Sequence, residues 1–100
     1  MSIPGGQLSH NIVVTGATIG VASAQAIAAK STRFGILFQN VHGTQSIALC
    51  PVSFGAAVLN SAGSIMLAPG GSLLLTDLRC NDAFNAIASG ASTPLTIWEF

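Results

Sequence analysis

Charged side chains are nearly absent from this sequence of 100 residues. Three basic and three acidic residues give a formal net charge of zero, whereas about a quarter of an ordinary soluble domain is charged. Without clustered Lys and Arg, the chain lacks the electrostatic footprint of a nucleic-acid-binding protein or of a basic membrane-surface protein. Because a neutral, apolar chain is poorly protected against association, we expect other subunits to cover much of its surface.

Tyrosine is absent, and cysteine and histidine occur twice each. The spacing of Cys50 and Cys80 matches no zinc pattern, so we expect two small buried apolar side chains. His42 precedes Gly43 and is expected in a turn, and no nucleophile motif accompanies it or His10. We therefore predict a protein that is not an enzyme, with no catalytic residue, no metal site and no cofactor.

Long hydrophobic runs are also missing. The longest charge-free stretch, residues 34–76, is interrupted by polar residues and glycines, and it lacks the about 20 mostly apolar residues that a membrane span needs. No positive residue precedes Lys30, so a signal peptide is not expected. The sequence therefore predicts no membrane partner.

What the sequence does contain is short apolar runs between turn signals. Pro69 and Gly70 suit the two central positions of a type II turn, and residues 73–75 then form a bounded apolar run. Residues 34–41 alternate, with Ile36 and Phe38 opposite Leu37, and both faces are apolar, as in a central strand. Further strands are expected over residues 10–15, 45–50, 64–67, 83–88 and 94–100, and over 21–29 in preference to a helix.

This pattern predicts an all-β fold, a small jelly-roll-like β-sandwich of seven or eight short antiparallel strands. We assign residues 8–100 to one domain and residues 1–7 to a flexible N-terminal arm, because Pro4 and the following glycines favour turns over packing. Two polar segments are expected in solvent: the turn at residues 30–33, and the loop that carries Asp77, Arg79 and Asp82.

One motif favours a different class of protein. Residues 15–20 (TGATIG) and the alanine-rich segment behind them resemble the start of a short-chain dehydrogenase, in which glycines let backbone amides approach a pyrophosphate. The third glycine of that pattern is Ala22 here, and the Tyr-x-x-x-Lys pair cannot exist without tyrosine. A nucleotide-binding fragment of this kind is therefore the alternative from another functional class.

The second half of the chain carries several recurring strand patterns. They are a strand ending in asparagine (ILFQN, 36–40), a small-apolar strand (SIALC, 46–50), a Pro-Gly turn with its strand (LAPGGSL, 67–73), an aromatic-x-Ala-Ile-Ala strand (FNAIA, 84–88) and a closing strand (LTIWE, 95–99). In these patterns residues 33–100 resemble small β-sandwich virion structural proteins of tailed phages and prophages. The glycine that is frequent in the second strand is Ala48 or Cys50 here.

The resemblance implies a structural role in a virion, as a head decoration protein or the base of a spike or fibre. We therefore expect a capsid decoration or stabilising protein, with a tail or head-tail adaptor component as the alternative. It would be made in the host cytoplasm and would lie on the capsid exterior as a homotrimer. Its partners would be the major capsid protein and other virion proteins.

The interface candidates are apolar residues of the arm and of the domain. An arm that orders on a neighbouring subunit would use apolar side chains, and tryptophan is enriched at binding hot spots. A carbohydrate-binding β-sandwich is a further alternative, but it would need exposed aromatic residues to stack on sugar rings. This chain has one Trp and no Tyr, so it is poorly equipped for that role. The predicted interface residues are Ile3, Pro4, Leu8, Phe54, Trp98 and Phe100.

Overall fold

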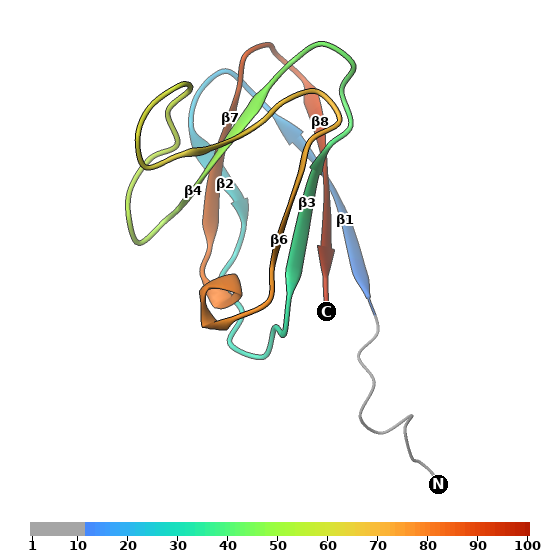
Figure 1. Ribbon diagram of the computed structural model, residues 1–100, viewed down its shortest axis with the longest axis vertical. Helices are drawn as coiled ribbons and strands as arrows, with labels where there is room; N and C mark the ends of the chain where they lie inside the picture. The colour runs from blue at the N-terminus through green and yellow to red at the C-terminus, as the bar shows by residue number, and fades with distance from the viewer. Residues whose placement is uncertain (1–11) are drawn as a thin grey trace, which may run out of the picture.

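The computed structural model describes residues 12–100, apart from the side chains of Leu78 and Arg79 (Figure 1). The predicted arm at residues 1–7 lies outside this range. Within it the chain forms eight short strands and one 3-10 turn. They are β1 (Val13–Ile19), β2 (Ala24–Ile27), β3 (Ile36–Asn40), β4 (Ile47–Pro51), β5 (Ile65–Leu67), β6 (Ser72–Leu75), η1 (Leu78–Asn81), β7 (Phe84–Ala88) and β8 (Thr93–Glu99).

The strands form two four-stranded sheets that pack face to face. The first sheet has the order β1-β8-β3-β6 and the second has the order β2-β7-β4-β5. Every pairing is antiparallel. Two such sheets, with the chain passing repeatedly between them, are a jelly roll. The predicted all-β, jelly-roll-like sandwich is therefore confirmed.

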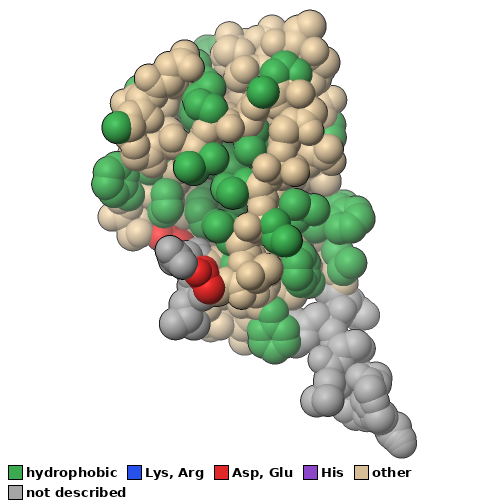
Figure 2. All heavy atoms as spheres, in the orientation of Figure 1, with side chains coloured by type: hydrophobic (Ala, Val, Ile, Leu, Met, Phe, Trp, Pro, Cys, Tyr) green, Lys and Arg blue, Asp and Glu red, His purple; other side chains and the backbone are tan. Residues whose placement is uncertain are grey.

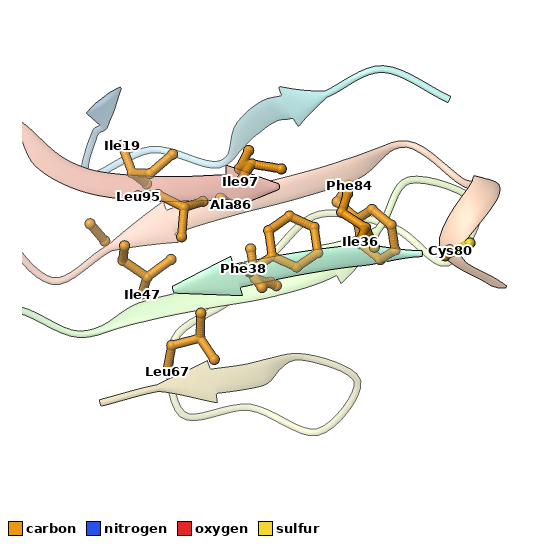
Figure 3. Close-up of a cluster of buried hydrophobic side chains, with 12 residues drawn as sticks. Ile19, Ile36, Phe38, Ile47, Leu67, Cys80, Phe84, Ala86, Leu95 and Ile97 are labelled. Atoms are coloured by element: carbon orange, nitrogen blue, oxygen red, sulfur yellow. The ribbon is translucent and has the colours of Figure 1, made fainter. Parts of the chain in front are cut away.

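The core lies between the two sheets and is built by alternation along the strands. Ile36 and Phe38 of β3 face inward and are fully buried, as are Leu95 and Ile97 of β8. Figure 3 shows these side chains meeting those of the second sheet. The rings of Phe38 and Phe84 are 5.1 Å apart at 69°, an edge-to-face contact that joins the sheets. The prediction that Ile36 and Phe38 lie opposite Leu37 in β3 is confirmed.

The first strand differs from its prediction. We expected a strand over residues 10–15, but β1 runs on to Ile19. Gly16 pairs with Thr96 inside the ladder, because β8 offers a complete partner strand along this stretch. The glycine-rich segment therefore does not lead into a helix, and β2 follows it. The nucleotide-binding alternative was wrong, because the strand–turn–helix geometry that it needs is absent from residues 12–30.

The Pro69-Gly70 turn was predicted correctly. Gly70 has a φ of 79°, and the amide of Gly71 donates to the carbonyl of Ala68 at 2.7 Å. Positive φ at this position is the feature for which a type II turn selects glycine. The strands that it joins do not form a hairpin, however: β5 belongs to the second sheet and β6 to the first. The turn therefore carries the chain from one layer of the sandwich to the other.

Candidate functional site

The cysteine and histidine side chains of the described residues occupy structural positions, in the core or in a turn. Cys50 and Cys80 are free and buried, as predicted. His42 lies in a turn, also as predicted: its Nδ1 accepts hydrogen bonds from the amides of Thr44 at 3.0 Å and Gln45 at 2.9 Å. Among residues 12–100, no three His, Cys, Asp or Glu side chains lie close enough together to hold a metal ion. No helix in the same range is long and apolar enough to cross a membrane.

The buried ion pair between Arg33 and Glu99 was not expected. Arg33 was predicted in a solvent-exposed turn, but it is only 5% exposed. Its Nη2 donates to Glu99 Oε2 and to the carbonyl of Ala28, both at 2.8 Å, and its Nη1 donates to the carbonyl of Cys80 at 2.6 Å. The guanidinium thus links the end of β8 to the segments around Ala28 and Cys80, so its role is to hold the fold together.

The outer face of the first sheet carries a line of exposed apolar side chains. Val14 pairs with Trp98, Trp98 pairs with Leu37, and Leu37 pairs with Leu74. Residues that pair directly across strands share a face of the sheet, so these side chains form one line across all four strands. Val14 is 64% exposed and Leu74 is 54% exposed. We call Val14, Trp98, Leu37 and Leu74 the apolar row.

The ring of Phe100 extends the apolar row toward the end of the sheet. Phe100 follows Trp98 by two residues on the same face, and a Cβ at Gly35 would approach its ring within 2.6 Å. Gly35 therefore leaves the space that the ring of Phe100 occupies. The carbonyl of Phe100 accepts hydrogen bonds from the amides of Phe34 and Gly35 at 2.6 and 2.7 Å, which fixes the chain end on β3. Green side chains gather over this part of the sheet in Figure 2.

The outer face of the second sheet is covered by the chain itself. Ala48 and Cys50 point outward from β4, yet both are buried, because the connection over residues 52–64 folds across them. Asn85 Nδ2 donates to the carbonyl of Gly55 at 2.9 Å, and the amide of Ala57 donates to Ser23 Oγ at 2.9 Å. Among residues 12–100, no corresponding segment covers the apolar row. The two faces of the sandwich are therefore unequal.

The predicted interface residues fall in different places. Trp98 belongs to the apolar row, Phe100 lies at its border, and Phe54 stands apart on the 52–64 connection, 72% exposed. Ile3, Pro4 and Leu8 lie outside the described residues. Sequence reasoning missed Val14, Leu37 and Leu74. Their alternation was visible, but their common line depends on the strand order β1-β8-β3-β6.

Comparison with known proteins gave one structural likeness. No family model matches the sequence, and no curated protein matches it. The jelly roll is similar to a solved structure described under Bacillus endospore appendages that form disulfide-linked pili. The match has a TM-score of 0.49 and 21% sequence identity, and covers 89% of this chain and 84% of the other. At this level it compares folds and assigns no family. The neighbour belongs to a pilus, which is a structural assembly.

The resemblance to phage virion proteins was wrong. The structure that matches is an endospore appendage protein of a bacterium, and no family model of any kind matches the chain. The strand motifs behind the expectation are Pro-Gly turns and alternating strands, which recur in many β proteins. The capsid-decoration and spike-base function, the tail or adaptor alternative and the location on a capsid exterior are therefore withdrawn.

Proposed function

We propose that this chain is a non-enzymatic structural subunit that packs against other copies of itself through the apolar row. The observation that carries the proposal is the continuous line Val14–Trp98–Leu37–Leu74 across a sheet face that no part of residues 12–100 covers. Exposed apolar side chains are normal when scattered singly, but a contiguous patch on one face marks an interaction surface.

The chemistry of the row favours an apolar partner surface. Its side chains are three aliphatic groups and one indole, and tryptophan is one of the residues enriched at binding hot spots. The cores of interfaces are depleted in charged residues, and only 6% of this chain is charged. A second copy offers the same uncharged surface. The homotrimer expected from the sequence remains a proposal about the number of copies.

Charge substitution on β1 tests the proposal, with a matched control on the same strand. Val14 and Thr18 are both exposed on the outer face, but Thr18 pairs with Pro94, outside the apolar row. We expect Val14→Lys to lower the mass of the particle measured by light scattering after size exclusion, because it places an ammonium group in a dehydrated contact. Thr18→Lys should leave the mass unchanged.

The same measurement on the unsubstituted chain gives the number of copies. A mass close to three times 10.1 kDa would agree with the trimer, and another multiple would replace that number while keeping the assembly. A monomer at every accessible protein concentration, or an equal response to Val14→Lys and Thr18→Lys, would refute self-association through the row. Far-UV circular dichroism of each variant checks that the fold is retained.

A further inference from the structure

An apolar groove opens at one edge of the sandwich, between β5 and β6. Each is the last strand of its sheet, and the groove between them has a volume of about 490 Å³. Ile65 pairs with the buried Leu49, and Leu73 and Leu75 pair with the buried Phe38 and Ile36, so all three face inward. Even so, Ile65 is 53% exposed. This edge of the core is left open.

A phenyl ring stands at the rim of this groove. Phe54 has the largest exposed fraction, 72%, among the large apolar side chains of residues 12–100. Its neighbour Ser53 lines the groove. The ring of Phe54 also lies over Gly63, where an added Cβ would approach it within 2.5 Å. Gly63 precedes the groove residue Ile65 by two positions, so the ring lies close to two chain segments, at Ser53 and at Ile65, that line the groove.

The turn that carries Phe54 is held rigidly. The amides of Phe54 and Gly55 donate to the carbonyl of Pro51 at 3.0 and 3.1 Å. Ser53 Oγ donates to Asp82 Oδ2, and Asn85 Nδ2 donates to the carbonyl of Gly55. A fixed apolar projection loses little conformational freedom on binding, which favours its use as an anchor.

We propose that the groove receives Phe54 of a second copy, and that the groove of the second copy receives Phe54 of the first. A two-fold axis brings the same patch of both subunits together, so a projection and a hollow that lie side by side on one surface can fill each other reciprocally. This contact goes beyond the proposed function, because it uses the β5–β6 edge, which shares only Leu74 with the apolar row.

The groove suits an aromatic side chain better than a charged partner. Its walls are mainly aliphatic and aromatic, and hollows appear among green side chains in that region of Figure 2, with acidic side chains below them. Asp82 is one of the acidic groups that line it, but Oδ1 of that carboxylate already accepts from the amide of Ala83 at 2.7 Å and Oδ2 from Ser53. A phenyl group buries about 150–250 Å² without needing a polar partner.

Complementary variants test this contact. In a Val14→Lys background, which removes the apolar row from the measurement, Phe54→Ser deletes the projection and Ile65→Arg fills the groove. We expect each to raise the dimer dissociation constant by about tenfold or more, as loss of a buried aromatic anchor does. Val58→Ser is the control, because Val58 is 50% exposed on the same connection and does not line the groove.

Mixing the two variants is decisive. The Phe54→Ser copy keeps an open groove and the Ile65→Arg copy keeps its ring, so an equimolar mixture can form one of the two contacts and should associate more tightly than either variant alone. A mixture no tighter than its components would overturn the contact, as would unchanged association of Phe54→Ser. Both variants also carry Val14→Lys, so the result of this mixing experiment does not depend on the apolar row. If the groove contact is refuted, the comparison of Val14→Lys with Thr18→Lys still tests the proposed function separately.

Discussion

At the scale of single residues, Arg33 connects parts of the fold that are distant in the sequence. Its guanidinium is buried and bonds to Glu99 and to carbonyls of residues 28, 80 and 82. Those partners come from β8, from the segment before β3 and from the region of η1. One side chain therefore joins three segments that are distant in the sequence.

Removing this side chain should cost much of the stability of the domain. We expect Arg33→Ala to lower the free energy of unfolding by about 3–5 kcal/mol, because Glu99 and several carbonyls would be left buried without their donor. Urea denaturation followed by circular dichroism measures the change. Lys30→Ala is the control: Lys30 is exposed, and its loss should stay within about 0.5 kcal/mol. Equal effects of the two substitutions would contradict this role of the pair.

The sequence could not have revealed this pair. Arg33 stands in a locally polar stretch, so a local pattern places it in solvent, and its carboxylate partner is 66 positions away. Cys50 and His42 were predicted correctly because their surroundings are decided nearby: Cys50 closes an apolar run, and His42 bonds to the next residues of its own turn. Cys80 lies between Arg79 and Asn81, and its burial was expected from the residue type alone.

At the scale of elements, the connection between β5 and β6 depends on one backbone conformation. The carbonyl of Asn40 accepts from the amide of Gly70, and the carbonyl of Gly71 accepts from the amide of Asn40, both at 2.9 Å. Asn40 Nδ2 also donates to the carbonyls of Leu67 and Gln45. The buried asparagine thus holds the turn against β3, and the turn must keep its positive φ at Gly70 to reach it.

Substituting alanine for Gly70 and for Gly16 should distinguish the effect of backbone conformation from the effect of steric space. An added Cβ meets nothing within 4 Å at Gly70 or at Gly16, but only Gly70 has a positive φ. We expect Gly70→Ala to destabilise the domain by about 1–2 kcal/mol, the cost of a left-handed conformation. Gly16→Ala in β1 should instead raise the stability by about 0.4–1 kcal/mol, because it restricts the unfolded chain. Thermal unfolding of both variants measures the difference; the same sign for both would refute the argument.

Strand faces were predictable and strand ends were less so. Alternation is a local property, and it correctly separated Ile36 and Phe38 from Leu37 in β3. The end of β1 is not local: Gly16 reads as a turn residue, and it remains in the strand because Thr96 of β8 pairs with it. The apolar row could not be predicted for the same reason, since it appears only when four strands are placed side by side.

At the scale of the whole molecule, the two faces of the sandwich differ because of one long connection. Residues 52–64, the yellow-green loop of Figure 1, leave β4 and fold over the outer face of the second sheet. Phe54 lies on this connection. The sequence does not indicate which sheet this connection covers. That choice leaves the first sheet as the uncovered face, and so places the proposed interface there.

Association through an uncharged face should have the thermodynamic signature of apolar burial. The apolar row contains no ionisable group, so sodium chloride at moderate concentration, which screens charge pairs, should leave the dissociation constant nearly unchanged. Burial of apolar surface gives a negative heat-capacity change, so the enthalpy of dilution measured calorimetrically should vary steeply with temperature. Ammonium sulfate should strengthen association, because excluded salts favour burial. Weakening by sodium chloride with a temperature-independent enthalpy would instead indicate that ion pairs, and not the row, hold the copies together.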